Sequence, residues 1–389
     1  MDTDVIKRLK QQYETPFYVF DEKQFIRNYE RMYEAFSSRY PFITISYAYK
    51  ANHTPYICKV AKKLGAYAEV SSEMEYYEAK ELVGYDDREI IYNGVCKGAG
   101  ALNVIGNGGI VNIDSIEEAK KLDPAGLLGK GVGLRVNVPV GNGIDSRFGV
   151  DIADIPTVID ILEKKEIYVA GLHCHCTKAR NLKNWKLKVN GLLEIAEVFF
   201  NNQIEYLDLG GGLYSNMPPQ MAENFSDYNN DWNEYAELVS RMVKRHFGEE
   251  LPRIILEMGT PLVADTMSLV AEVTAIKHVA DRKYAICNCG MYDIGEGSRK
   301  INYPVTVLSE NEALTGVDLT GNTCMEADIF YRGYDGRIGV GSTVVIGGIG
   351  AYSIVAKPPF IIPASMMVTS EGEIIKHRQT YQQVFETYA

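Results

Sequence analysis

The sequence predicts a (β/α)8 barrel followed by a second, mostly antiparallel β domain. Short β-rich runs alternate with helical stretches as far as Pro261, the alternation then stops, and polar residues or glycines recur where the runs end. Short apolar runs separated by helices are typical of parallel strands joined by helical crossovers. Eight such units fit a closed barrel better than an open, doubly wound sheet.

The eight expected barrel strands follow one another at fairly regular intervals. They are the runs 42–50, 66–70, 89–94, 109–114, 132–138, 169–176, 204–212 and 253–259. The stretches between them suit helices, as "SSEMEYYEAKELVG" does, because its spacing gives one apolar and one charged face. We therefore expect the barrel to span residues 26–261.

The residues after Pro261 have a different pattern. "LVADTMSLVAEVTAIKHVA", "YAICNCG", "GVDLTGNTC" and "SMMVTSEGEII" predict strands joined by turns, with few helices between them. The uncharged stretch from Val340 to Ala356 is interrupted by glycines, so we expect two strands with a glycine turn there and no membrane span. The β domain should cover residues 262–389.

Composition narrows the class of protein. The 389 residues carry a net charge of −11, which argues against a nucleic-acid partner. The first residues contain no apolar core that would resemble a signal peptide. Seven scattered cysteines, an odd number, fit reduced thiols better than a disulfide framework, so we expect a cytoplasmic protein.

Polar residues and glycines end the predicted strands, and in a barrel all these ends face one cavity. They are Lys50, Glu69, Asn93, Asp114, Arg135, His173, His175, Gly210 to Gly212, and Glu257. Lys50 of "ISYAYKAN" fits a surface anchor, a phosphate clamp or a nucleophile that forms a Schiff base.

Each of the other motifs allows a structural and a functional interpretation. The glycines of "LDLGGG" suit a tight turn or a phosphate loop. Glu257 of "ILEMG" suits an ion pair, a metal ligand or an acceptor for a protonated ring nitrogen. In "HCHC", strand alternation places both histidines on one face, either to pack or stack or, with further ligands, to bind a metal. We expect "CNC" at 287–289 to be a buried strand, and we expect no metal site.

The lysine, glycine, histidine and acidic motifs fit together if the ligand is pyridoxal 5′-phosphate. The lysine would hold the aldehyde, the glycine turn the phosphate, and the carboxylate would keep the ring nitrogen protonated. An imidazole would stack on the ring.

The chain resembles the alanine-racemase-fold (fold type III) pyridoxal-phosphate decarboxylases, the diaminopimelate and ornithine decarboxylase group. "TPFYVFD" is similar to the N-terminal segment of that family, which implies that residues 1–25 contribute to the β domain. "YAYKAN", "AEVSSEMEY", "GLHCHC", "LDLGGGL", "EMGT", "TCMEAD" and "GAYS" follow in family order. The resemblance implies cofactor-binding roles for Lys50, Glu69, His175, Gly210, Gly211, Gly212, Glu257 and Tyr352.

The same resemblance implies residues that act on the substrate. Cys324 takes the catalytic cysteine position, Asp328 that of a partner acid, and Phe360 that of a substrate-facing residue. In this family the cysteine loop reaches the barrel of a second subunit, which implies a homodimer with shared active sites.

The sequence departs from the family pattern at the phosphate and substrate positions. Thr177 and Lys178 replace a phosphate-binding serine segment, and Gly259–Thr260 replaces a glycine–arginine pair. Met325 replaces the acid that reads a distal amine, and Glu326 follows it on the opposite side of an extended chain. Arg299 is a candidate substitute for binding a carboxylate.

The expected function is decarboxylation of an amino acid or an amino-acid-like intermediate that is neither diaminopimelate nor ornithine. A specialised pathway such as siderophore or antibiotic assembly is the expected setting, and Cys324 or Lys50 the expected proton donor. The alternatives are an amino-acid racemase, a non-catalytic regulator that keeps this fold, and a metal-dependent hydrolase that uses His173 and His175.

Overall fold

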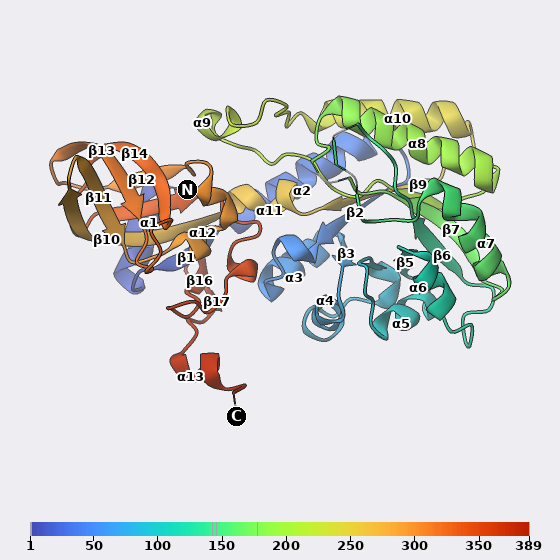
Figure 1. Ribbon diagram of the computed structural model, residues 1–389, viewed down its shortest axis with the longest axis horizontal. Helices are drawn as coiled ribbons and strands as arrows, with labels where there is room; N and C mark the ends of the chain where they lie inside the picture. The colour runs from blue at the N-terminus through green and yellow to red at the C-terminus, as the bar shows by residue number, and fades with distance from the viewer. Residues whose placement is uncertain (1, 142, 145, 177, 389) are drawn as a thin grey trace. The chain divides into compact units, whose positions relative to one another are not determined.

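The computed structural model describes every residue except 1, 142, 145, 177 and 389. The chain forms two compact units. One consists of Ile26–Tyr214 with Asp227–Thr260, and the other of Met1–Phe25 with Ser215–Ser226 and Pro261–Ala389. We call them the barrel unit and the β unit, and Figure 1 labels the elements of both.

The barrel unit confirms the predicted fold class. Its eight strands are parallel and form a closed barrel in chain order, in which the last strand, β9, pairs with the first, β2. The strands are β2 Ile43–Ala48, β3 Tyr67–Val70, β4 Ile90–Tyr92, β5 Ile110–Ile113, β6 Gly131–Arg135, β7 Tyr168–His173, β8 Tyr206–Asp208 and β9 Arg253–Met258. Each lies within, or one residue outside, a run expected from the sequence.

Helix α2, Glu22–Ser37, precedes β2, and further helices follow the strands. They are α3 Pro55–Lys63, α4 Glu73–Tyr77, α5 Gly100–Gly106, α6 Ile116–Lys121, α7 Ile155–Glu163, α8 Leu182–Phe200 and α10 Trp232–Phe247. A π-helix, Glu78–Val83, continues α4, and 3-10 turns cover Tyr49–Ala51, Asp87–Glu89 and Ile152–Asp154. Helices α8 and α10 pack side by side (Figure 1).

The barrel interior is apolar below its polar rim. Side chains from five different strands meet in one buried cluster, namely Ile91, Ile110, Ala170, Tyr206 and Ile255. Because parallel barrel strands are covered on both sides, their sequences are short continuous apolar runs rather than alternating ones. This property made the strands recognisable in the sequence.

The β unit contains a mixed, mostly antiparallel sheet in the order β14-β13-β11-β10-β1-β16-β17, with β15 and β12 joined through β10. The strands are β1 Phe17–Phe20, β10 Met267–Val279, β11 Arg282–Cys287, β12 Val305–Leu308, β13 Ala313–Thr320, β14 Ile329–Arg337, β15 Thr343–Gly347, β16 Met366–Thr369 and β17 Ile374–Lys376. Only the pairs β1–β16 and β11–β13 are parallel. Strand β1 lies in the N-terminal segment and pairs with both β10 and β16.

Helices in the β unit are short apart from the first. They are α1 Thr3–Gln12, α9 Pro219–Ala222, α11 Thr260–Val263, α12 Met291–Ile294 and α13 Tyr381–Phe385, with 3-10 turns at Ala264–Thr266, Glu296–Arg299 and Ile354–Ala356. Helix α1 places Ile6 and Leu9 in a core with Phe17, Val270 and Val368. This packing ties the first residues of the chain to the sheet.

The prediction of two strands between Val340 and Ala356 was wrong. Only β15 forms there, and the residues after it make a tight loop that ends in a 3-10 turn. Gly348 has φ +72°, and a Cβ on Gly350 would lie 1.7 Å from the Val263 carbonyl oxygen. The glycines therefore serve close backbone packing and not a hairpin. Within the described residues no helix is long and apolar enough to cross a membrane.

Candidate active site at the barrel rim

Lys50 lies where the first barrel strand ends. Strand β2 stops at Ala48, and a 3-10 turn, Tyr49–Ala51, presents the lysine at the carboxyl end of the barrel. Its ammonium pairs with the carboxylate of Glu69, which is fully buried at the end of β3, while the lysine side chain is about one-third exposed. The lysine is therefore reachable but held by a buried opposite charge.

A buried amide connects Glu69 to Glu257. Asn93, just after β4, donates from Nδ2 to Oε1 of Glu69 at 3.0 Å and also to Oε1 of Glu257 at the end of β9. Its own Oδ1 accepts a 2.9 Å hydrogen bond from Asn112. Lys50, Glu69, Asn93 and Glu257 thus form one chain of contacts across the strand ends.

Glu257 lies among further titratable groups. Its side chain, that of His173 and that of Asp208 are all buried, and their ligand atoms lie within 4.8 Å of one another. Burial, followed by the charge of Glu257, raises the pKa of Asp208 well above its usual value, which favours the protonated acid. Burial opposes ionisation of Glu257 too, but His173 and Lys50 hold the pKa of Glu257 well below its usual value.

The same three residues could also serve as metal ligands. A histidine and two carboxyl groups within 4.8 Å are a ligand set that a metal ion accepts. Nε2 of His173 lies 3.4 Å from Oε2 of Glu257, whereas its Nδ1 has no hydrogen-bond partner among the described residues. The pair proposed for the hydrolase, His173 with His175, does not make this set, because its other members are the acids Asp208 and Glu257.

The glycine turn packs closely against His175 and β9. Gly210 has φ +59° and Gly212 has φ +102°, conformations that favour glycine. A Cβ on Gly211 would lie 2.5 Å from the Glu257 carbonyl oxygen. The Gly211 N–H donates to Nδ1 of His175 at 3.0 Å, and burial followed by the charge of Lys50 lowers the pKa of His175 to about 3. His175 is therefore a neutral ring beside the turn.

The arrangement fits the group that the sequence predicts. The rim offers an amine and an ionised buried acid, and the glycine cradle beside them leaves no room for a Cβ. An amine can bind an aldehyde, an ionised acid can accept a hydrogen bond from a protonated ring nitrogen, and a glycine turn can hold a phosphate. We conclude that the residues present suit pyridoxal phosphate.

The end of β9 also packs against the lysine turn. A Cβ on Gly259 would lie 2.7 Å from Cβ of Ala51, so a glycine is needed for close approach. Thr260 is half-buried and brings no charge to this position. Lys178 is exposed with φ +55°. Thr177 lies outside the described residues.

The remaining predicted residues belong to the β unit. Cys324 is exposed on the loop between β13 and β14. Asp328 is buried below it, and its carboxylate accepts hydrogen bonds from the Met291 N–H at 2.7 Å and from the Thr323 hydroxyl at 2.6 Å. A third bond comes from the Thr323 N–H at 3.2 Å. Asp328 therefore fixes the loop that carries Cys324.

Phe360 and Tyr352 differ in their surroundings. The Phe360 ring packs edge-on against Tyr292 with centroids 5.5 Å apart, and the Tyr292 hydroxyl donates to Sδ of Met325 at 3.6 Å. Tyr352 is half-exposed and has φ +56°. Glu326 is exposed. The side chain of Arg299 lies outside the described residues.

Three residues near the rim were not selected from the sequence. Asn112 and Asp208 join the network through a 3.3 Å hydrogen bond, and Lys188 of α8 donates to the Leu209 carbonyl at 2.6 Å. Asp208 stands in "LDLGGG" and Asn112 in "VNID", where a polar residue inside a buried strand was the available signal. Lys188 is three residues after Trp185, a spacing that places the two side chains on the same side of a helix, and this was its signal in the sequence. In the structure, Nζ of Lys188 lies 3.5 Å from the centroid of the Trp185 ring.

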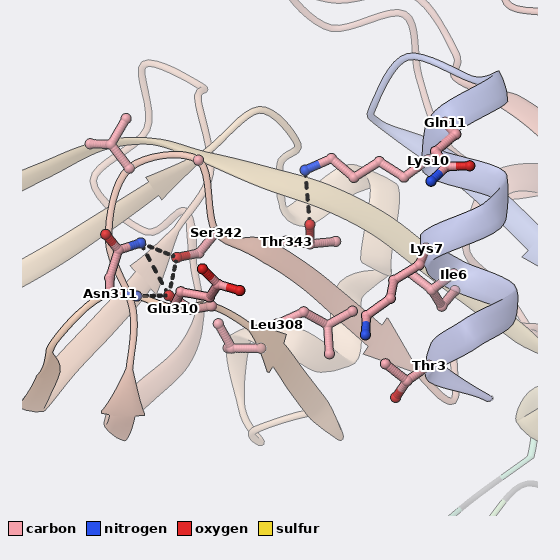
Figure 2. A pocket seen from close by; sticks show the side chains of 14 residues that line it. Thr3, Ile6, Lys7, Lys10, Gln11, Leu308, Glu310, Asn311, Ser342 and Thr343 are labelled. Atoms are coloured by element: carbon pink, nitrogen blue, oxygen red, sulfur yellow. Dashed lines mark hydrogen bonds between the residues drawn. The ribbon is translucent and has the colours of Figure 1, made fainter.

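A separate groove lies on the β unit. It has a volume of about 750 Å³ and runs between α1 and the loops beside β12 and β15 (Figure 2). Lys10 crosses its wall to Thr343 at 2.8 Å and pairs with Glu272 at 2.7 Å. None of the residues predicted for the active site lines this groove.

Comparison with known proteins identifies a family and a set of relatives. Residues 23–264 match the family model described as the pyridoxal binding domain of pyridoxal-dependent decarboxylases. Diaminopimelate decarboxylase of Methanothermobacter thermautotrophicus is 27% identical over 399 aligned positions, which cover 96% of this chain and 91% of the relative.

Solved structures agree in fold. The structure of diaminopimelate decarboxylase from M. jannaschii has a TM-score of 0.84 and 25% identity, covering 98% of this chain and 94% of that one. Lysine decarboxylase from Selenomonas ruminantium has a TM-score of 0.81 at 21% identity, with 95% and 96% covered, and shows the fold alone.

Proposed function

Because the chain belongs to the pyridoxal-dependent decarboxylase family and is a pyridoxal-phosphate-dependent amino-acid decarboxylase, we propose a substrate whose distal end carries no charge. This excludes diaminopimelate and ornithine as the preferred substrates. The observation that supports the proposal is Met325, which by the sequence resemblance replaces an acid of the family. Its Sδ accepts a hydrogen bond from Tyr292, whose ring packs against Phe360.

The barrel residues hold the cofactor in this proposal. Lys50 binds its aldehyde, the turn at Gly210–Gly212 receives its phosphate, and the ionised Glu257 faces its ring nitrogen. Pyridoxal phosphate supplies an electron-accepting ring, which lowers the barrier to loss of the α-carboxylate. His175 covers the ring as a neutral imidazole, and Glu69 keeps the Lys50 amine oriented.

The β unit supplies the proton donor. Cys324 is exposed, and the buried carboxylate of Asp328 fixes its loop, so the thiol is presented at a defined place. We assign Asp328 to positioning this loop and not to direct contact with substrate, because both its oxygens already accept hydrogen bonds. The site is completed in a homodimer, in which Cys324 protonates the α-carbon of a substrate bound to the partner subunit's barrel.

The apolar cluster decides the substrate class. Met325, Tyr292 and Phe360 offer two aromatic rings and a thioether near Cys324, and none of these three side chains carries a charge to pair with a distal ammonium. A distal charge left without a partner there would cost about 2–5 kcal/mol. An uncharged aliphatic or aromatic end gains by burial against the same surface. A specialised pathway such as siderophore or antibiotic assembly is the setting that we propose for such a substrate.

Diaminopimelate decarboxylase is the second candidate function. The relatives of M. thermautotrophicus and M. jannaschii carry that name and match nearly the whole chain. A racemase would retain the carboxylate, so release of CO2 separates it from both candidates.

The test is CO2 release from a panel of amino acids in the presence of the cofactor. We expect the highest kcat/KM with an uncharged distal end, as in phenylalanine or methionine, compared with lysine, ornithine and meso-diaminopimelate. The Met325→Glu variant should lose that preference and gain at least about tenfold on lysine. Glu326→Gln, at the exposed neighbouring position, is the matched control and should change neither. A parent enzyme that prefers meso-diaminopimelate would overturn the proposal in favour of the second candidate.

The cofactor anchor is tested separately. Lys50→Ala should abolish the visible absorbance of the bound cofactor and all turnover, whereas Lys63→Ala, an exposed lysine of α3, should retain both. Retained turnover in Lys50→Ala would refute the assignment of the lysine.

A further inference from the structure

Two cysteines lie in contact directly behind the candidate active site. Cys174 and Cys176 flank His175 just beyond β7, and their Sγ atoms are 3.4 Å apart. A disulfide requires a separation of about 2.0 Å, so the two sulfurs need to approach by little more than an ångström. The contact follows from alternation, because residues two apart on an extended chain face the same side.

The environment of this pair differs between its members. Cys174 is fully buried, whereas Cys176 is partly accessible, with Sγ 3.8 Å from the Val138 carbonyl oxygen. One sulfur can therefore meet a small molecule, while the other can be reached only by its neighbour. In a pair that forms a disulfide, the accessible cysteine reacts with the oxidant first, and the second cysteine then attacks the oxidised sulfur.

A buried lysine lies near the pair, and burial lowers its pKa. Lys188 of α8 is 1% exposed, and its Nζ donates to the Leu209 carbonyl and lies over the ring of Trp185. The hydrogen bond from Cys174, together with the charges of Lys188 and Arg135, lowers the pKa of Cys176 to about 7 despite burial. The same hydrogen bond and burial raise the pKa of Cys174 well above its usual value. A lowered pKa favours the thiolate of Cys176, which is the reactive form of a cysteine.

We propose that Cys174 and Cys176 are a modification site at which hydrogen peroxide forms a reversible intramolecular disulfide. The Cys176 thiolate attacks one peroxide oxygen, the O–O bond breaks, and the products are a sulfenic acid and hydroxide. The Cys174 thiol then attacks the Cys176 sulfur, forms the S–S bond and releases the sulfenic oxygen as water, its proton supplied by the thiol. The two sulfurs lose two electrons and the peroxide gains them. A thiol reductant reverses the change by disulfide exchange.

Oxidation reaches the cofactor site through His175, a step that rests on the role proposed for that residue. Its Nδ1 accepts the hydrogen bond of the Gly211 N–H at 3.0 Å. A bond between the residues on either side of His175 shortens the segment and re-aims the imidazole. The oxidised enzyme should therefore bind pyridoxal phosphate at least about tenfold more weakly, since interactions in a cofactor cradle depend on sub-ångström placement.

The chain contains a matched internal control. Cys287 and Cys289 have the same spacing, but both are buried in the β unit, and burial raises the pKa of Cys287 to about 12 and that of Cys289 well above its usual value. This second pair should not react.

Peptide mapping of the peroxide-treated holoenzyme tests the proposal. After alkylation of remaining thiols, trypsin releases residues 166–178 with Cys174 and Cys176, and residues 284–299 with the control pair. We expect the first peptide to lose about 2 Da, to escape alkylation and to be restored by dithiothreitol. The control peptide should stay fully reduced. Alkylated cysteines in the first peptide, or equal oxidation of both peptides, would overturn the proposal.

Variants separate the two steps. Cys174→Ser should stop at a sulfenic acid on Cys176 that dimedone traps, and Cys176→Ser should leave Cys174 unmodified. Lys188→Met should slow oxidation of Cys176 at least about threefold, because the thiolate loses its buried cation. Sulfenic acid on Cys174 in place of Cys176 would contradict the assignment. These measurements need no turnover, so they stand whether or not the proposed substrate class is correct.

Discussion

Replacing Asn93 by Leu removes the one amide that bridges the two buried acids of the rim. Leucine has nearly the same shape, so the change deletes the hydrogen bonds to Glu69 and Glu257, and the one accepted from Asn112, without opening a large cavity. A hydrogen bond to a charged group contributes about 1.5–3 kcal/mol, so two of them predict a loss of about 3–6 kcal/mol in the free energy of unfolding.

Asn184 provides the matched control. It is also buried, but its Nδ2 donates to a single neutral acceptor, the Val140 carbonyl, at 2.7 Å. Asn184→Leu should therefore cost only about 1–2 kcal/mol. The difference between the two variants therefore reports the charged acceptors together with one neutral hydrogen bond, the one from Asn112, which accounts for about 1 kcal/mol of it.

Urea unfolding followed by tryptophan fluorescence measures both variants. The chain has two tryptophans, Trp185 and Trp232, and both are fully buried in the barrel unit, so the signal reports the unit that contains Asn93. The cofactor-free protein is used, because a change in cofactor affinity would otherwise shift the transition by mass action. If Asn93→Leu loses no more stability than Asn184→Leu, the charged bridge does not stabilise the rim as argued.

Three further predictions follow from the rim and its surroundings. Gly211→Ala should weaken cofactor binding at least about tenfold in an absorbance titration, since its Cβ would lie 2.5 Å from a carbonyl oxygen, whereas Gly106→Ala, with no atom within 4 Å, should bind normally. Because burial raises the pKa of Asp208 and favours its protonated form, Asp208→Asn should keep the unfolding free energy within about 1 kcal/mol of the parent, whereas Asp208→Ala should lose more. Equal losses would contradict a protonated acid. Burial raises the pKa of Glu78 to about 7. The contribution of Glu78 to the free energy of unfolding is therefore fully present below its unfolded pKa near 4.5 and is lost as pH rises through 7. The change in unfolding free energy caused by Glu78→Gln should therefore be about 3 kcal/mol more stabilising at pH 8 than at pH 4. An effect of the substitution that does not depend on pH would refute this.

The barrel could be predicted because its local signals agree. Each strand is a short apolar run, each run ends in a polar residue or a glycine, and the helices between them have one apolar face. The β unit was harder, because β14 carries Gly333, Gly336 and several exposed charges, which weaken the alternation of a strand. That strand forms at the end of the sheet through its pairing with β13, a contact that a local pattern does not reveal.

The residues of the candidate site also differ in how well the sequence predicts them. Motifs contiguous in sequence, such as those around Lys50 and Gly211, could be selected because the chemistry needs those residue types side by side. The bridge from Glu69 through Asn93 to Glu257 joins three strands, and the sequence places Asn93 at a strand end without indicating its partners. Long-range pairing and the raised pKa of Asp208 depend on closure of the barrel, which brings β9 between β8 and β2.

The segment from His173 to Cys176 shows why one strand end serves two purposes. The histidines face the rim, where His173 lies 3.4 Å from Glu257 and His175 accepts from Gly211. The cysteines face α8 and its buried Lys188. Because side chains alternate along an extended backbone, the two faces carry different residue types but share the same short segment. A covalent change on the cysteine face must therefore move the histidine that lies between them, and no change in the glycine turn or in Glu257 is needed for the cofactor site to respond.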